Sequence, residues 1–114
     1  MSVYDQAHAL ARALKSCDEY TSFLAAKAKV DADKNAKKML RDFQQRQIAV
    51  QKAQMLNEEV PEEQIKQLER MFEVLSYNPI IKEYLTAEFR LARMLADIQK
   101  IIGEAVELGL DEED

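Results

Sequence analysis

The sequence predicts an all-α protein, an antiparallel bundle of four to five long helical segments with coiled-coil-like packing. The chain has 114 residues but only two glycines and two prolines, and helix-forming residues dominate it. A sheet protein of this length would need more turns, and therefore more glycine and proline. Apolar residues also recur at steps of three and four over long stretches. We expect a single helical domain over residues 1–110 and an acidic tail over 111–114.

The first two helices are predicted from their capping residues. The first should begin at Ser2, with Asp5 completing a capping box. Ser16 and Glu19 have the same spacing, so we expect the first helix to break near Ser16 and Ser16 to cap the second helix. Between residues 31 and 35 the signals weaken, and a kink, a short turn and a continuous helix are all compatible with the pattern.

A helical hairpin is expected next. The third segment runs to about Leu56, and residues 57–61 form a loop in which Pro61 occupies the first position of a fourth helix. Apolar residues of that helix are spaced 3-4-3 and form a seam: Ile65, Leu68, Phe72 and Leu75. The short connections predict that the third and fourth helices, and the fourth and last, are antiparallel neighbours.

The last helix is the predicted spine of the protein. Asn78 is a good N-cap, Pro79 suits the first turn, and the helical pattern continues to about residue 108. Such a helix is about 45 Å long. One apolar line along it contains Ile81, Tyr84, Leu91, Leu95, Ile98, Ile102 and Ala105. A second line, which widens the first, contains Leu85, Phe89, Ala92 and Ala96.

The length of this spine predicts self-association. It is longer than the fourth helix, so its far half needs a further partner. Because monomers rarely leave wide apolar stripes exposed to water, we expect a homodimer or a higher homo-oligomer formed by helix packing. The candidate interface residues are Leu91, Leu95, Ile98 and Ile102.

Charge is distributed unevenly along the chain. The net charge is −5, but residues 27–52 hold eight basic and three acidic side chains, a net +5 that leaves −10 for the rest. Within this segment Lys34, Lys38 and Arg41 share a helix face, and Asp33 and Lys37 are spaced to form an ion pair.

We interpret this basic face as a solvated surface or a dock for an acidic partner, including the acidic tail of another copy. The only aromatic residue in the segment, Phe43, belongs to the apolar side, so no surface for base stacking is present. Nucleic acid is therefore disfavoured as a partner. An RNA-associated accessory role that uses the basic face of residues 27–52 is the alternative function.

The chemistry-bearing residues do not combine into an active site. His8 is the only histidine, and Asp5 could accompany it, but one histidine cannot supply a bundle di-metal site. Cys17 is the only cysteine and is interpreted as a small, half-buried residue. No glycine-rich phosphate loop and no Ser-His-Asp set is evident. We expect that the protein is not an enzyme and that it has no catalytic, cofactor-binding or metal-binding residues.

Glu88 occupies a position in the apolar line of the last helix. A carboxylate there must be paired, and Arg12 is the candidate partner, with Arg90 and Arg93 also nearby. We favour a buried ion pair that fixes helix register over a metal-binding or general-acid carboxylate, since no other ligands accompany it.

Several features favour the cytoplasm. A single cysteine excludes an internal disulfide framework and fits a reducing compartment. The first residues lack the pattern of a signal peptide, and no apolar run approaches the length of a membrane span.

Four stretches carry a family resemblance: residues 75–90, 60–63, 101–105 and 3–7. They resemble the YlbF/YmcA-type family of small helical proteins from Gram-positive bacteria, and most closely its YheA-like branch. The resemblance implies an oligomeric bundle of long helices without catalytic residues, and some relatives act as non-enzymatic partners in regulatory complexes.

Those relatives use cysteines near the C-terminus in complexes reported to carry iron–sulfur clusters. Residues 109–114 contain no cysteine, so no cluster is expected. We therefore expect a cytosolic helical oligomer that works through protein–protein contacts in a regulatory role.

Overall fold

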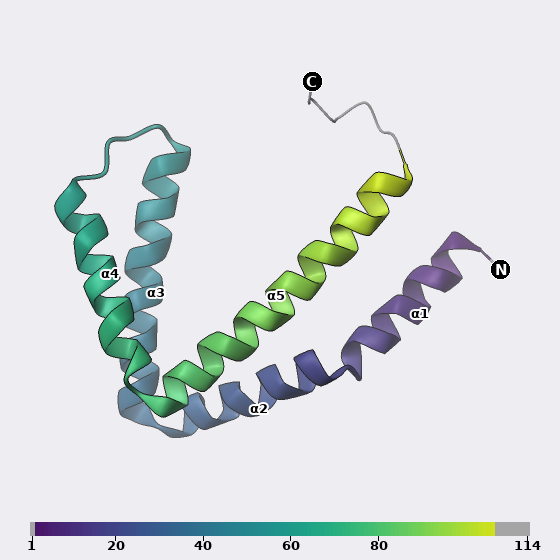
Figure 1. Ribbon diagram of the computed structural model, residues 1–114, viewed down its shortest axis with the longest axis horizontal. Helices are drawn as coiled ribbons and strands as arrows, with labels where there is room; N and C mark the ends of the chain where they lie inside the picture. The colour runs from purple at the N-terminus through teal and green to yellow at the C-terminus, as the bar shows by residue number, and fades with distance from the viewer. Residues whose placement is uncertain (1, 107–114) are drawn as a thin grey trace. The chain divides into compact units, whose positions relative to one another are not determined.

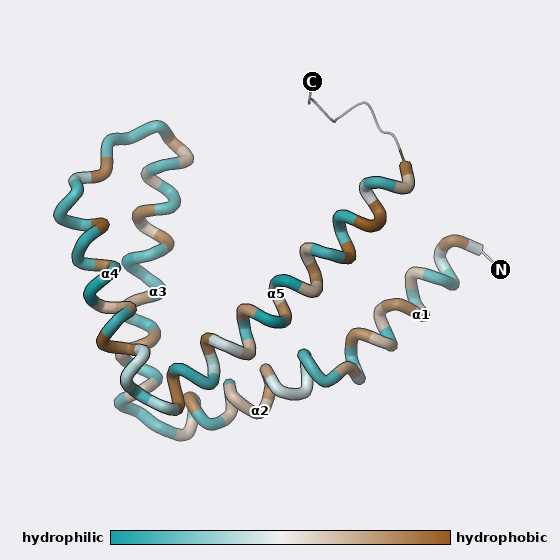
Figure 2. The backbone as a smooth tube through the Cα atoms, viewed as in Figure 1, coloured by the Kyte–Doolittle hydropathy of each residue, from teal (hydrophilic) through white to brown (hydrophobic). Residues whose placement is uncertain are grey.

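The computed structural model describes residues 2–106, which form five α-helices and no strand (Figure 1). The all-helical class is therefore confirmed. The helices are α1 (Val3–Lys15), α2 (Asp18–Ala32), α3 (Lys34–Met55), α4 (Glu62–Ser76) and α5 (Pro79–Ala105). Apolar and polar residues are interspersed along each of them (Figure 2). The acidic tail predicted over 111–114 lies outside the described residues. The predicted contact between this tail and the basic face of another copy therefore stays a prediction.

The chain divides into two compact units. Unit 1 combines Met1–Phe23 with Thr86–Asp114, and unit 2 is Leu24–Leu85. Both α2 and α5 therefore contribute residues to each unit. The single helical domain expected over residues 1–110 stays a prediction.

In unit 1 the capping box at the start of α1 is confirmed. The Ser2 hydroxyl accepts a hydrogen bond from the Asp5 N–H at 3.1 Å, and the Asp5 carboxylate accepts one from the Ser2 N–H at 3.3 Å. Two of the N–H groups that a helix start leaves without partners are satisfied in this way.

The second predicted capping box is wrong. Ser16 ends α1 instead, and its hydroxyl donates to the carbonyls of Arg12 and Ala13 at 3.3 and 3.4 Å. Cys17 occupies the N-cap position of α2, where its Sγ accepts from the Tyr20 N–H at 3.4 Å. The last carbonyls of a helix also lack partners, and the Ser16 hydroxyl bonds to them rather than to the next helix.

In unit 2 the ambiguous region between α2 and α3 is a short turn. Asp33 alone leaves helical geometry, with φ −111° and ψ 104°. Its carboxylate accepts a hydrogen bond from the Ala36 N–H at 3.0 Å and so caps α3. One capping residue is enough to separate the two helices.

The predicted hairpin of α3 and α4 is confirmed, and the two helices run antiparallel and side by side (Figure 1). After the C-cap Leu56, Asn57 takes a left-handed conformation with φ 59°. The Asn57 N–H donates to the Gln54 carbonyl at 3.1 Å and the Glu58 N–H donates to the Ala53 carbonyl at 2.9 Å. This Schellman arrangement ends α3, and asparagine tolerates the backbone conformation that it requires.

The core of unit 2 receives apolar side chains from all four of its helical segments. Ile81, at the start of α5, is fully buried with 0% exposure. On the hairpin, the rings of Phe43 and Phe72 lie with their centroids 6.0 Å apart, although Phe72 remains 49% exposed. The buried residues of this unit are Ala26, Val30, Ala36, Leu40, Phe43, Leu75, Ile81 and Tyr84.

The start of α5 is also as predicted. The Asn78 side-chain oxygen accepts hydrogen bonds from the N–H groups of Ile80 and Ile81 at 3.0 and 3.3 Å. With 27 residues, α5 is about 40 Å long. Antiparallel packing of α4 against the last helix stays a prediction.

Replacing Ile81 with alanine tests the importance of this core. We expect Ile81→Ala to lower the free energy of unfolding by about 2–5 kcal/mol, because it leaves a cavity at a fully buried site. Denaturant unfolding followed by circular dichroism would measure the change.

Ile48→Ala is the matched control, since Ile48 belongs to α3 of the same unit and is 61% exposed. We expect it to change the stability by less than about 1 kcal/mol. Equal losses for the two variants would contradict this assignment of the core.

Candidate interaction surfaces

The predicted interface residues on α5 differ in exposure. Leu91 and Ile98 are half-buried, whereas Leu95 is 40% and Ile102 is 54% exposed. We call these four residues the α5 apolar line. Further along α5, Ile101 and other apolar side chains are exposed. The far part of the helix therefore presents substantial apolar surface to solvent.

A shallow apolar groove in unit 1 brings part of this line together with α1 and α2. Its volume is about 330 Å³. The lining residues are Ala11, Leu14, Lys15, Tyr20, Leu91 and Leu95. Periodicity had placed Leu91 and Leu95 on one side of α5, but the residues opposite them could not be predicted from α5 alone. Near the start of α1, Val3 and Tyr4 are also exposed.

Glu88 and Arg12 are both in unit 1. The structure places Glu88 in a half-buried position on α5 and Arg12 in an exposed position on α1. No charged side chain is buried among the described residues. The ion pair between these two residues stays a prediction.

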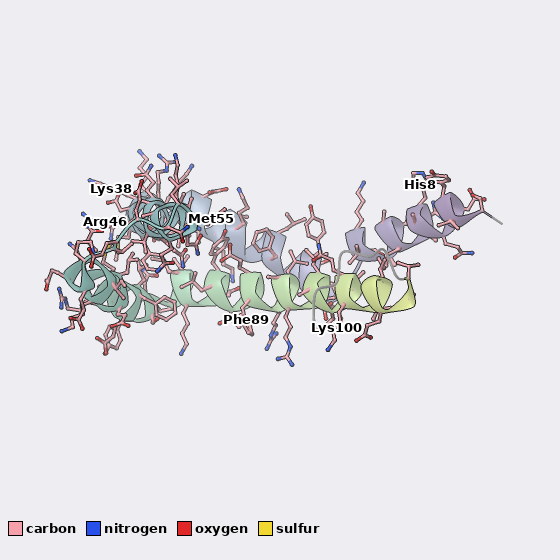
Figure 3. All side chains as sticks on the ribbon, turned by 90° about the horizontal axis from the view of Figure 1, so that it is seen from above. His8, Lys38, Arg46, Met55, Phe89 and Lys100 are labelled. Atoms are coloured by element: carbon pink, nitrogen blue, oxygen red, sulfur yellow. The ribbon has the colours of Figure 1, made fainter. Side chains whose placement is uncertain are left out.

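The basic face predicted on α3 consists of Lys34, Lys38 and Arg41, and all three side chains are exposed. Figure 3 shows Lys38 projecting from this helix together with Arg46. Phe43 is only 6% exposed. As expected, the aromatic ring of this segment is therefore not available for stacking on a base.

A small pocket lies beside the basic face, between α2, α3 and the start of α5. Its volume is about 180 Å³. We call it the α2–α3 pocket, and its lining residues are Lys27, Val30, Asp31, Lys37, Leu40, Arg41, Gln44 and Tyr84. Sequence analysis singled out only Arg41 of this set as part of a candidate surface.

Asp31 organises the cations at this pocket. Its carboxylate lies 3.1 Å from Lys27 Nζ and 3.9 Å from Lys37 Nζ. The predicted pair of Lys37 with Asp33 gives way to this contact with Asp31, because the Asp33 carboxylate caps α3. The ion pair of Lys27 with Asp31 could have been predicted from the sequence, because the two residues are four apart on one helix. The approach of Lys37 to Asp31 could not, because it depends on the turn at Asp33.

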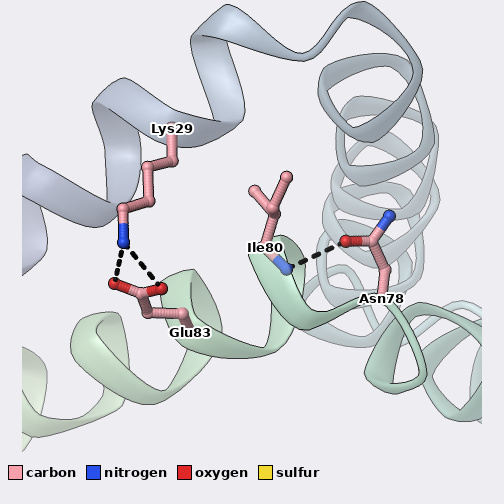
Figure 4. A network of polar contacts seen from close by, with 4 residues as sticks. All are labelled: Lys29, Asn78, Ile80 and Glu83. Carbon is pink, nitrogen blue, oxygen red and sulfur yellow. Dashed lines mark hydrogen bonds and ion pairs between the residues drawn. The ribbon is translucent and has the colours of Figure 1, made fainter.

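A neighbouring ion pair joins α2 to α5 within the same unit. Lys29 Nζ donates to both carboxylate oxygens of Glu83, at 3.2 and 3.1 Å (Figure 4). Both side chains are about half exposed, so the pair contributes at most about 1 kcal/mol to stability.

The remaining candidates do not form a chemical site among residues 2–106. His8 is exposed near the N-terminal end of α1 (Figure 3), and the Asp5 carboxylate is part of the capping box. Over the same residues, no three His, Cys, Asp or Glu side chains are grouped as metal ligands would be. No helix in this part of the chain combines the length and the apolar character needed to cross a bilayer.

Comparison with known proteins gives consistent results over nearly the whole chain. A family model described as "Control of competence regulator ComK, YlbF/YmcA" matches residues 3–107. A UPF0342 protein of Desulfitobacterium hafniense is 46% identical over 106 residues, which are 93% of this chain and 86% of that protein. A UPF0342 protein of Symbiobacterium thermophilum is 45% identical over 108 residues, or 95% of this chain and 96% of that one.

A solved structure has the same fold. It is described as a protein of unknown function (DUF964) from Bacillus stearothermophilus, and it superposes with a TM-score of 0.85. The match covers 97% of this chain and 98% of that one, at 18% sequence identity. At this level of identity the likeness concerns the fold alone.

The role of Cys17 as a helix cap can be tested by two substitutions. Cys17→Ser keeps a side-chain acceptor for the Tyr20 N–H, whereas Cys17→Ala removes it. We expect the alanine variant to be less stable than the serine variant by about 0.5–2 kcal/mol, the usual cost of losing an N-cap. Thermal unfolding would measure the difference. Equal stability of the two variants would show that the thiol contributes nothing as a cap.

Proposed function

The chain belongs to the YlbF/YmcA family, described by its control of the competence regulator ComK, and from this membership we propose that it is a non-enzymatic regulatory protein. It works in the cytoplasm through protein–protein contacts, and its first partner is a second copy of itself. Its contact surface is the α5 apolar line.

One observation carries this proposal, the exposure of apolar side chains along the far part of α5. Ile101 is 66% exposed, Ile102 is 54% exposed and Leu95 is 40% exposed. Contiguous exposed apolar surface marks interaction sites in soluble proteins. A two-fold pairing would bury this surface on both copies, because each helix presents the same line to the other.

The free energies of burial and association indicate that a stable dimer needs contacts beyond the α5 apolar line. Fully burying a leucine or isoleucine side chain stabilises by about 1.5–3 kcal/mol, and the four residues of the line are already partly buried. Association costs about 4–15 kcal/mol in lost freedom. We therefore include the exposed Val3 and Tyr4 of α1 in the proposed contact surface.

A charge placed in the α5 apolar line tests the proposal. We expect Leu95→Asp to convert the assembly to monomers at micromolar concentration, because an unpaired carboxylate would have to be buried at the interface. Analytical ultracentrifugation of the two proteins would measure the change in mass.

Lys100→Asp is the matched control, because helical periodicity places residue 100 on the opposite side of α5. It changes the charge more than Leu95→Asp does, yet the assembly should persist. A wild-type protein that is monomeric at micromolar concentration would contradict the proposal, as would assembly that is unchanged by Leu95→Asp.

The alternative function, an RNA-associated accessory role, would use the exposed cations of the basic face. Proteins that bind single-stranded RNA usually combine such cations with exposed aromatic rings. Phe43, the aromatic residue of this segment, is buried. We therefore favour protein–protein contact over RNA binding as the function.

A further inference from the structure

We propose that the α2–α3 pocket binds the carboxylates of an acidic peptide segment, and that its occupant is the acidic segment 107–114 of a second copy of this chain. The pocket belongs entirely to unit 2. The inference goes beyond the proposed function, since it needs neither the α5 apolar line nor assembly through it.

The pocket concentrates positive charge in a small volume. Lys27, Lys37 and Arg41 line it, and Asp31 is the one acidic residue among its lining groups. The net charge of these groups is therefore +2. The pocket volume of about 180 Å³ is several times the roughly 30 Å³ that one water molecule occupies. This volume is large enough for the carboxyl group of an acidic side chain.

The donors at the pocket suit a carboxylate. An ammonium group has three N–H donors, and among residues 2–106 the Lys27 ammonium donates one hydrogen bond, to Asp31. Lys37 Nζ lies 3.9 Å from the same carboxylate, which is an ion pair beyond hydrogen-bond distance. Arg41, one turn after Lys37 on α3, adds a guanidinium that can bind a carboxylate through two parallel hydrogen bonds.

The side chains are accessible as well as charged. Those of Lys27 and Lys37 are 53% and 46% exposed. Next to the pocket, Lys34 and Lys38 extend the positive surface along α3. A segment with several consecutive carboxylates could place one in the pocket and others on these lysines.

The chain itself contains a segment of matching charge. Residues 107–114 hold five acidic and no basic side chains, and residues 27–52 have a net charge of +5. Segment 107–114 lies outside the described residues and directly follows Val106. Charge complementarity of this kind sets the specificity and the association rate of a contact.

The chemistry favours this segment over RNA. No lining residue of the pocket other than Tyr84 is aromatic, and Tyr84 is only 8% exposed. A peptide carboxylate needs no stacking surface, so RNA is treated as an alternative outcome of the test.

The test uses the full chain with the acidic side chains of 107–114 changed to amides, so that its own segment does not compete. A fluorescent peptide with the sequence of residues 107–114 is titrated with this protein, and its anisotropy is recorded. We expect binding that weakens about tenfold between about 20 and 200 mM salt, because the contact is between exposed charges.

Arg41→Glu in the same protein should weaken peptide binding by about tenfold or more, and Arg41→Gln should weaken it less. Arg93→Glu is the matched control, since Arg93 is exposed on α5 and does not line the pocket; it should leave the affinity unchanged. Circular dichroism confirms that each variant is folded.

The proposal is overturned if the peptide does not bind, if a peptide with amides in place of the carboxylates binds equally well, or if Arg41→Glu and Arg93→Glu have the same effect. Binding of a single-stranded RNA oligomer that depends on Arg41, without binding of the peptide, overturns it in favour of RNA. The assembly state of the Leu95→Asp variant is a separate measurement, so failure of one proposal does not decide the other.

Discussion

Burial of the first turns of α5 in unit 2 is the constraint on which the rest of that unit depends. Ile81 and Tyr84 are buried there, together with Val30 of α2, Leu40 of α3 and Leu75 of α4. The ion pair of Lys29 and Glu83, which joins α2 to α5 in this unit, is half exposed and contributes little by comparison. Apolar packing therefore holds these four segments together, and it positions the cations of the α2–α3 pocket.

Capping side chains place the helix boundaries. Asp33 separates α2 from α3, and the pocket depends on this turn because Lys27 precedes the turn and Lys37 follows it. Asn57 ends α3 in a left-handed conformation, which lets α4 return along α3. In each case one residue with a short polar side chain determines where the chain changes direction.

Much of this fold could be predicted from the sequence because helices are local structures. Periodicity predicted the helices, and the caps at Ser2 and Asn78 were identified correctly. The cap at Ser16 was assigned wrongly, since serine can bond either to the helix before it or to the helix after it. Only the backbone geometry decides between these two.

The candidate interaction surfaces were less predictable. Lys34, Lys38 and Arg41 could be grouped from the sequence because they lie on one helix. The α2–α3 pocket was not, because its cations come from two helices and meet only after the turn at Asp33 is formed. Contacts between helices depend on tertiary structure, which periodicity within one helix does not report.

The division of the chain into two units also affects the order in which it folds during synthesis. Unit 2 is a continuous stretch of chain, whereas unit 1 joins residues near the start to residues after Thr86. Closing a long loop costs entropy before any contact is gained, and chains are synthesised from the N-terminus. The α1 residues of unit 1 are therefore synthesised well before their α5 partners, whereas all residues of unit 2 are synthesised before Thr86.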